Sequence, residues 1–506
     1  MMYDDSWVSI YQGNCLDELA QLPAESIQMV CTSPPYWGLR KYSGEQEMVW
    51  GDNQCEHRWD MQDKKVLAMT QGGKAKRPYQ EQIDQDLQYK AGFCSLCGAV
   101  KCAFGLESTP EDYVEHTIEF LRAIRRVLKK DGVVFWDIGD SYVGGGVNKP
   151  HTGWAIHSKL NREGIFFQKP IVGKPKDLCL IPFRVAIAAQ QDGWFVRSVI
   201  IWNKLNPLPE SCRDRPTESH EYIIMLTKSS HYYWDMEAVR EKYQPDSLRP
   251  SKRNVNNPKG MDRQGVDDWL ENKSTGRNLR SVWTFSTESF GVEMCKACGK
   301  VYESAEYQRL PEIGRKERLK PVNGYKDGFR SIAYVDNELD KDESPTMIKK
   351  ICHCGRSDWL SHFATFPRAL PEKCILAATS EKGNCSKCGK PWVRIIEKGD
   401  IVKGEWGHNQ PVIGKHTESK ESRGEFMSRY PSGCHYENKT LGWQPSCQCN
   451  ASPTPAVVLD PFAGSGTVGE VAKSLGRKCI LIDLSAEYCK LAQKRVENIP
   501  LPMILA

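Results

Sequence analysis

The sequence lacks long apolar runs and lacks a large excess of charge of either sign. No stretch reaches the roughly 18 apolar residues that a membrane-spanning helix needs, so we expect no membrane contact. The first five residues, Met1 to Asp5, include two acids and have no apolar core, so we expect no secretory signal and a cytoplasmic location. The 69 Lys and Arg against 64 Asp and Glu give a net charge of +5, which is too small for a strongly basic, tail-like protein. An apolar fraction of 40% excludes a mostly disordered chain.

The chain contains an unusually large number of cysteines, 20 among 506 residues. In a secreted protein this number would suggest disulfides, but closely spaced pairs in a cytoplasmic protein suggest metal ligands. Three pairs have Cys-x-x-Cys spacing and two have Cys-x-Cys spacing: Cys94/Cys97, Cys295/Cys298, Cys385/Cys388, Cys352/Cys354 and Cys447/Cys449.

Structural zinc takes four ligands, commonly as two close pairs, so the pairs divide into three sets. The first is Cys55, His57, Cys94 and Cys97, with Cys102 as a substitute ligand; the second is Cys295, Cys298, Cys352 and Cys354; the third is Cys385, Cys388, Cys447 and Cys449. Gly299, Gly355 and Gly389 follow such pairs, as tight turns around a metal require. We expect up to three structural Zn²⁺ ions. Reduced free thiols are the alternative, which explains the pair spacing poorly.

Alternating strands and helices predict an α/β fold with a mainly parallel sheet covered on both faces. A short strand followed by a turn is expected within 7–17, and further strands near 27–31, 133–138, 194–202, 221–227, 457–459 and 479–482. Helices are expected from Thr109 to Asp131-Gly132, and over 180–190, 361–379, 467–476 and 486–496.

A glycine-rich loop, Asp460 to Gly469, lies between a predicted strand and a predicted helix. It contains a GxGxxG pattern, and Asp483 ends the next strand, where an acid binds ribose hydroxyls in nucleotide folds. No Lys follows the glycines, so a Walker-type phosphate loop is not expected. NAD, FAD and S-adenosylmethionine all remain open, as does a turn that serves packing. Because only 23 residues follow Asp483, we expect the N-terminal half to supply the rest of the sheet, in a circularly permuted order.

Ser33-Pro34-Pro35-Tyr36 resembles the catalytic motif of DNA amino-methyltransferases, and Asp460 to Gly466 resembles their cofactor motif. The catalytic motif comes first, which is the order of the beta class. The resemblance covers about half the chain, namely 7–40, 106–146, 178–235, 278–290, 361–376 and 456–497. It implies a circularly permuted, Rossmann-like, S-adenosylmethionine-dependent methyltransferase sheet with zinc-binding inserts, encoded by a bacterium or a phage.

The chemistry of this family explains the motif residues Ser33, Pro34, Pro35 and Tyr36. An exocyclic base amine is a poor nucleophile, because its lone pair is delocalised into the ring. The Ser33 hydroxyl and the Pro34 carbonyl are two acceptors for its hydrogens, and Tyr36 stacks on the base, so catalysis is positioning and electrostatics. The base must leave the duplex to reach this loop. Ser33 at the first position favours the N4 amine of cytosine; the N6 amine of adenine is the alternative.

The resemblance also implies cofactor contacts. These are Asp460, Phe462, Gly464, Gly466, Thr467 and Asp483, together with Phe363 and Thr365 of the segment that packs on the methionine part of the cofactor. For that segment a helix-entry turn with buried aromatics is the alternative. Asp137 to Tyr142 resembles a strand end near the active site, with a solvated loop as the alternative. Trp202-Asn203-Lys204 resembles the lining of the target-base pocket, with Trp202 as a core residue as the alternative.

Double-stranded DNA is the expected partner, and a cognate restriction system fits the same resemblance. Basic residues gather in 240–282, where we expect Arg249, Lys252, Arg253 and Arg277 to contact DNA.

The expected organisation is a catalytic half 1–235 (with a zinc-bearing insert at about 50–105), a target-recognition region 236–290, a zinc insert 291–360, a cofactor-packing segment 361–380, a zinc insert 381–450 and a cofactor-binding half 451–506. An RNA methyltransferase and a non-catalytic zinc DNA-binding protein are the more distant alternatives. The oligomeric state and the DNA target do not follow from the sequence.

Overall fold

The structure is a computed structural model of the whole chain. It describes residues 1–38, 47–51, 54–65, 88–107, 109–143, 176–207, 209–210, 212–241, 277–287, 292–295, 297–303, 309–310, 312–313, 349–356, 359–361, 367–397, 401–402, 435–436 and 439–500. Among these residues no helix combines the length and the apolar character that crossing a membrane requires.

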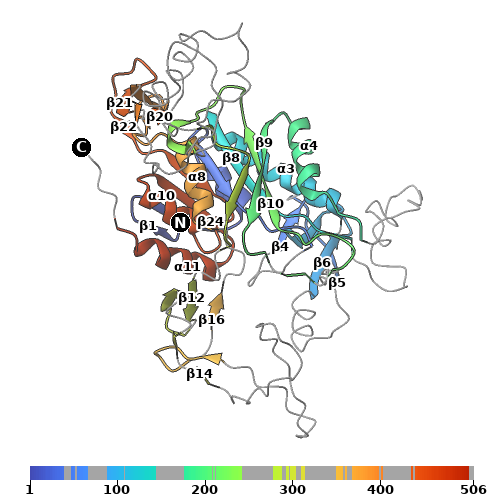
Figure 1. Cartoon of the computed structure of the whole chain (residues 1–506). Coiled ribbons are helices and arrows are strands. Elements are labelled where there is room, and N and C mark those ends of the chain that lie inside the picture. Colours follow the sequence, from blue (N-terminus) through green and yellow to red (C-terminus); the bar gives the residue numbers. More distant parts are fainter. Residues whose placement is uncertain are drawn as a thin grey trace, which may run out of the picture.

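A nine-stranded sheet forms the centre of the described molecule, in the order β1-β2-β24-β23-β3-β8-β10-β9-β11 (Figure 1). Its strands are β1 (Tyr3–Asp4), β2 (Val8–Gln12), β3 (Ile27–Thr32), β8 (Leu128–Ile138), β9 (Phe195–Lys204), β10 (His220–Thr227), β11 (Val282–Phe285), β23 (Val457–Asp460) and β24 (Lys478–Asp483). Only β1 and β10 run against the other described strands of this sheet. The expected mainly parallel sheet is therefore confirmed.

Helices cover both faces of this sheet, which explains why its central strands are apolar on both sides. One face carries α1 (Cys15–Gln21), α3 (Pro110–Val127) and α4 (Ile181–Gln191), and its core contains Leu121, Val134 and Trp136. The other face carries α8 (Ala369–Ala378), α10 (Thr467–Ser474) and α11 (Ala486–Glu497) (Figure 1). A short 3-10 helix, η2 (Glu237–Val239), packs against α8.

The last strands of the chain lie in the middle of the sheet. β23 pairs in parallel with both β24 and β3, so the C-terminal segment sits between strands of the N-terminal half. This pairing confirms the circularly permuted order of the methyltransferase sheet.

Smaller sheets carry the cysteine pairs. The first is β4 (Glu47–Trp50), β7 (Val100–Ala103), β6 (Gln88–Cys94) and β5 (Trp59–Lys65). The second is β13 (Val301–Glu303), β12 (Val292–Cys295) and β16 (Trp359–Ser361), with the pair β14 (Glu312–Ile313) and β15 (Lys349–Lys350). The third group consists of the pairs β17 (Asn384–Cys385) with β22 (Pro453–Thr454), β18 (Trp392–Glu397) with β21 (Lys439–Pro445), and β19 (Ile401–Val402) with β20 (His435–Tyr436).

Two predicted helix boundaries are wrong. The helix that begins at Thr109 ends at Val127 rather than at Asp131-Gly132, because the chain is already extended at Leu128 and continues as β8. Gly132 is inside that strand, where a Cβ would lie 2.9 Å from the Gln28 carbonyl oxygen of β3. The predicted helix over 361–379 begins only at Ala369, since Ser361 still pairs with β12.

Candidate active site and cysteine clusters

The Ser-Pro-Pro-Tyr loop begins where β3 ends, at the carboxyl edge of the sheet. Thr32 is the last residue of β3, and the neighbouring strand β23 ends at Asp460. The Thr32 hydroxyl donates a 2.7 Å hydrogen bond to Oδ1 of the buried Asp460, across 428 positions of sequence. This bond joins the two loops that the sequence singles out.

The Tyr36 hydroxyl is the centre of a polar network from three strands. Ser33 Oγ donates to the Tyr36 oxygen at 3.1 Å, and Tyr36 donates to Oε2 of Glu221 at 2.7 Å. The Lys204 ammonium pairs with the other oxygen of Glu221. Asp137 Oδ2 lies 3.5 Å from the Tyr36 hydroxyl. Since its own proton is directed to Tyr36, Ser33 Oγ keeps its lone pairs for an incoming donor.

Burial controls the protonation of this network. Desolvation raises the pKa of Asp137 well above its usual range, and the nearby Glu221 raises it further. Desolvation likewise raises the pKa of Tyr36, so the phenol keeps its proton. A neutral Asp137 is consistent with its Oδ1, which is buried without a hydrogen-bond partner among the described residues. Gly139 fixes the Tyr36 ring, because a Cβ there would lie 2.8 Å from Cε2 of the ring.

Two carboxylates organise the glycine-rich loop. Asp460 Oδ1 accepts the Phe462 backbone N–H at 3.1 Å, and Asp483 Oδ2 accepts that of Gly464 at 2.9 Å. Burial raises the pKa of Asp460 to about 7 and that of Asp483 to about 6. Asp460 is therefore near its titration midpoint at neutral pH, whereas Asp483 is mostly ionised there.

Two glycines of the loop serve packing between helices and strands. A Cβ on Gly466, whose φ is +79°, would lie 2.7 Å from the Ala492 Cβ of α11. A Cβ on Gly469 would lie 2.7 Å from Leu481 Cδ1 of β24. The packing explanation of the GxGxxG pattern thus holds for these two glycines, beside the role in a cofactor site that the sequence suggests.

Phe462 and Thr467 also have partners within the protein. Phe462 packs edge-on against Phe120, with ring centroids 5.0 Å apart, and is partly buried in the core. The Thr467 hydroxyl accepts from Arg495 Nη1 at 2.9 Å, and the same nitrogen donates to Ser465 Oγ at 3.1 Å. Arg495 of α11 therefore holds the start of α10 through hydrogen bonds to Ser465 and Thr467.

Sequence comparison identifies the family to which this arrangement belongs. The family model described as DNA methylase, for N6 and N4 methyltransferases, matches residues 27–386 and 450–494. The chain belongs to the DNA methylase family. It is thus a DNA methyltransferase of the N6/N4 amino-methyltransferase type, which uses S-adenosylmethionine.

Two relatives named type II methyltransferases and one solved structure are similar to this chain. The type II methyltransferase M.SfiI of Streptomyces fimbriatus is 27% identical over 95% of this chain and 89% of its own length. M.Cfr9I of Citrobacter freundii is 33% identical over 48% of this chain and 61% of its own. The solved structure of the PvuII cytosine-N4-specific DNA methyltransferase aligns over 99% of this chain and 90% of its own, with a TM-score of 0.40 and 14% identity.

The methylase brings each of the three predicted ligand sets together. Within each set the ligand atoms lie within 4.8 Å of one another. Cys55 Sγ is 3.8 Å from Cys94 Sγ, and His57 Nδ1 is 3.5 Å from Cys97 Sγ. Cys102 is outside this group and is buried in β7, so it is not needed as a substitute ligand.

Tight turns shape the clusters as the sequence predicts. The glycines after the cysteine pairs have positive φ, and their N–H groups return to the carbonyl of the first cysteine of the pair. For Gly299 φ is +72° and the bond to Cys295 is 2.7 Å; for Gly389 φ is +73° and the bond to Cys385 is 2.8 Å. Gly98 forms the same turn on Cys94. Four thiolate or imidazole ligands in such turns fit tetrahedral zinc.

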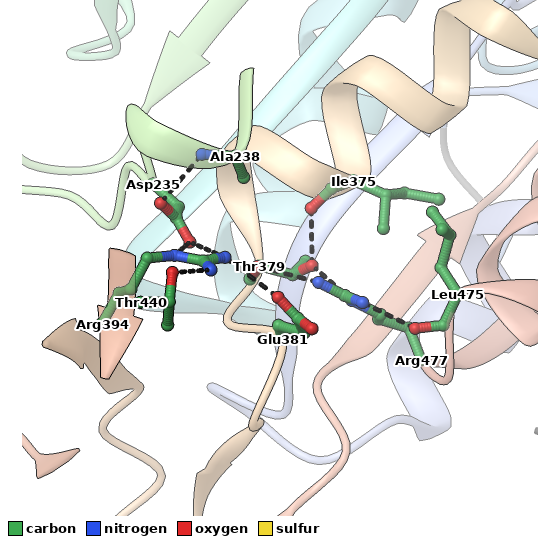
Figure 2. A network of polar contacts seen from close by, with 9 residues as sticks. All are labelled: Asp235, Ala238, Ile375, Thr379, Glu381, Arg394, Thr440, Leu475 and Arg477. Carbon is green, nitrogen blue, oxygen red and sulfur yellow. Dashed lines mark hydrogen bonds and ion pairs between the residues drawn. The ribbon is translucent and has the colours of Figure 1, made fainter. Parts of the chain in front are cut away.

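The third cluster adjoins the amino edge of the methylase sheet, opposite the Ser-Pro-Pro-Tyr loop. Lys129, at the start of β8, donates to the Gly389 carbonyl at 3.0 Å. Arg394 of β18 pairs with Asp235 at 3.0 Å and with Glu381 at 2.9 Å (Figure 2). Arg477, just before β24, donates to the Thr379 hydroxyl at 3.0 Å (Figure 2).

Several predicted contact residues lie outside the described part of the chain. These are Phe363, Thr365, Arg249, Lys252 and Arg253. Arg277 is described, and its Nε pairs with Glu241 Oε2 at 3.0 Å, where Glu241 also pairs with Arg280 at 2.7 Å. This pairing holds together the two ends of the segment between 241 and 277.

The sequence analysis did not single out Glu221 and Glu107, two carboxylates near the Ser-Pro-Pro-Tyr loop. Glu221 is an acid at the start of an apolar strand, a signal that was available. Its contact with Tyr36 depends on the antiparallel insertion of β10 beside β8, which the sequence did not indicate. Glu107 is a single acid between irregular segments and carried no such signal.

Proposed function

We propose that this methylase transfers a methyl group to the N4 amine of cytosine in double-stranded DNA, with the target base flipped out of the duplex. The observation that carries the proposal is the directed hydrogen-bond chain from Ser33 through Tyr36 to Glu221. It supports Ser33 Oγ as an acceptor for an amine hydrogen. An uncharged acceptor of this kind suits the cytosine amine, which the serine at the first motif position favours.

In the proposed mechanism Ser33 Oγ and the Pro34 carbonyl accept the two amine hydrogens, and Pro35 keeps the loop extended. These bonds direct the nitrogen lone pair out of the ring plane, and S-adenosylmethionine supplies the methyl group when it is bound. After transfer the nitrogen carries one proton too many, which it loses to solvent or to a neighbouring acceptor. The Glu221 carboxylate, through Tyr36, favours the transfer step because it stabilises the positive charge that develops at the amine nitrogen as the methyl group is bound.

For the cofactor we propose a site on the loop between β23 and α10, with Asp460, Phe462, Gly464, Gly466, Thr467 and Asp483, and with Phe363 and Thr365 from the preceding segment. The partly exposed Asp483 carboxylate is positioned at a strand end, where acids accept ribose hydroxyls. We propose that Arg249, Lys252, Arg253 and Arg277 contact DNA within a target-recognition region at 236–290. The type II names of the relatives support a cognate restriction enzyme as partner.

We further propose that each cysteine cluster binds one structural Zn²⁺. All four ligand positions are protein atoms in each set, so no open position is left for catalysis. The inserts at about 50–105, 291–360 and 381–450 would then depend on the metal for folding. Elemental analysis of the purified chain should find about three zinc ions per molecule. One zinc fewer is expected in Cys298→Ser, and a metal-free protein would refute this assignment.

The methyl product tests the base assignment. DNA from cells that express the chain is digested to nucleosides and analysed by mass spectrometry, with a Ser33→Ala plus Tyr36→Ala variant as control. We expect N4-methylcytosine that is absent from the control. N6-methyladenine would select the adenine alternative, and methylation that survives in the control would refute the catalytic loop. The same purified chain assayed on RNA separates the RNA alternative.

A further inference from the structure

The segment that links the first cysteine cluster to α3 contacts the catalytic loop along its length. The Gly38 N–H donates to the Gly105 carbonyl at 2.8 Å, and the Trp37 indole donates to the Glu107 carbonyl at 3.1 Å. Gly105 has φ of +88°, and a Cβ there would lie 3.0 Å from Pro35 Cβ and 3.1 Å from the Tyr36 carbonyl. The backbone of 105–107 is therefore in direct contact with the residues that follow Ser33.

The Glu107 side chain fixes the shape of this segment. Its Oε2 accepts the Gly105 N–H at 2.9 Å, which closes the left-handed turn. Its Oε1 lies 3.1 Å from His116 Nδ1 of α3, and only 1% of the side chain is exposed. A buried carboxylate is costly unless it is paired, so this arrangement ties the turn to the helix strongly.

His116 is in turn held by the cluster sheet. Its ring stacks on Trp50 of β4, with centroids 3.6 Å apart and an interplanar angle of 6°. The Trp50 indole donates to the Cys102 carbonyl of β7 at 3.4 Å. β7 begins three residues after Cys97 and leads directly into Gly105. Glu107 thus lies where the cluster sheet, α3 and the catalytic loop meet.

We propose that Glu107 is a positioning residue for methyl transfer. By holding Gly105 and His116 together, it fixes the position of the catalytic loop, Ser33 to Tyr36, relative to the target base. It touches neither base nor cofactor and acts through Trp37, Gly105 and the backbone of Pro35 and Tyr36. The proposal rests on the assignment of Ser33 to Tyr36 as the catalytic loop. It predicts an effect on the rate of transfer rather than on cofactor binding.

The test compares Glu107→Ala, Glu107→Gln and a matched control, Glu111→Gln. Glu111 is a neighbouring carboxylate of α3 that pairs with Arg184 at 2.6 Å and does not contact the catalytic loop. Rates are measured with radiolabelled S-adenosylmethionine and saturating bulk DNA from cells that lack the methylase, and cofactor Kd is measured by calorimetry.

For Glu107→Ala we expect kcat to fall about 100-fold, because misplacement of a reacting group by about 1 Å costs that much, with cofactor Kd changed less than about threefold. Glu107→Gln should recover about a tenth or more of the wild-type rate, because its amide oxygen still accepts the Gly105 N–H. Glu111→Gln should stay within about twofold of wild type. An unchanged kcat in Glu107→Ala, or a loss confined to KM or Kd, would overturn the proposal.

A second variant decides the matter if Glu107→Ala does not fold. Gly105→Ala leaves the carboxylate intact and places a methyl group against Pro35 and Tyr36. The same loss of kcat with retained cofactor binding supports the proposal, and wild-type kcat refutes it. Ser33→Ala, assayed alongside, separates the two assignments. If Ser33→Ala remains active, the assignment of Ser33 to Tyr36 as the catalytic loop is wrong. If Ser33→Ala is inactive but Glu107→Ala is fully active, only the positioning role of Glu107 is refuted.

Discussion

The two edges of the central sheet carry ligand clusters in different surroundings, with three cysteines and one histidine in the first cluster and four cysteines in the third. At the carboxyl edge, the sheet of the first cluster leads into contacts with the catalytic loop. At the amino edge, the third cluster contacts the start of strand β8 through Lys129. Both clusters contain a Cys-x-x-Cys turn, closed by Gly98 in the first and by Gly389 in the third, but the neighbours differ. We therefore expect the role of each cluster to follow from what it packs against.

The polar groups of the two edges differ in the same way. At the amino edge, Arg394 and Arg477 are satisfied by acids, hydroxyls and carbonyls (Figure 2). At the carboxyl edge, Asp137 is buried with an unpaired oxygen and a strongly raised pKa, beside the Tyr36 hydroxyl. Perturbed groups of this kind are typical of functional sites, and well-paired ones are typical of structural networks. Variants at the carboxyl edge should therefore change rate, and variants at the amino edge should change stability.

The largest effect is expected from Tyr36→Phe. It removes the hydroxyl between Ser33 and Glu221 but keeps the ring, so kcat should fall about 100-fold or more while the melting temperature stays unchanged. The matched control is Tyr233→Phe at the amino edge, where the Tyr233 N–H donates to the Asp131 carbonyl at 2.9 Å. That variant should keep its kcat. A kcat loss in Tyr233→Phe equal to that in Tyr36→Phe would remove the distinction between the edges.

The next effect is expected at the amino edge from Arg394→Met. It leaves Asp235, which is 7% exposed, without its partner. Removal of one partner from a buried ion pair costs about 3 kcal/mol, which urea unfolding should show, while kcat per folded molecule stays constant. Arg122→Met is the control, since Arg122 is 63% exposed in its pair with Asp192 and the expected cost is below about 1 kcal/mol. Equal costs for both variants would contradict the structural role of Arg394.

A smaller effect separates the clusters themselves. Cys97→Ser should lower kcat about tenfold through the catalytic loop, whereas Cys388→Ser should leave kcat of the folded protein within about twofold and lower its melting temperature. Zinc content, kcat and melting temperature are measured for both. If both variants lower kcat equally at equal zinc loss, the position of a cluster on the sheet does not determine its role.

These contrasts show what the sequence could predict. Cysteine spacing is local, so the ligands of all three clusters could be named before the structure was known. The hydrogen bond between Thr32 and Asp460 could not be predicted, because it requires β3 and β23 to be neighbours in the sheet, which the local pattern does not specify. Glu221 could not be assigned, because its contact with Tyr36 depends on the direction and order of β10. The pattern predicts a helix end at Gly132, but the structure places this glycine in β8, where the lack of a side chain allows β3 and β8 to approach closely.

The smallest effect concerns pH. Without cofactor, Asp460 and Asp483 have pKa values of about 7 and about 6, above the value of 3.8 for an exposed Asp. The folded protein therefore binds more protons than the unfolded chain between these values, so its stability should fall as the pH rises from about 4 to about 7.

Cofactor binding should depend on pH in the opposite direction, because in the proposed cofactor site the ribose hydroxyls donate to the ionised form of Asp483. A pKa of about 6 for Asp483 predicts that the Kd for S-adenosylmethionine weakens about twofold between pH 7.5 and pH 6 and about tenfold by pH 5. Calorimetry over this range should show the dependence in wild type and its loss in Asp483→Asn. Because Asp483 is at the carboxyl edge, Arg394→Met at the amino edge should keep the wild-type profile, and a profile altered there would mean that the two edges are coupled.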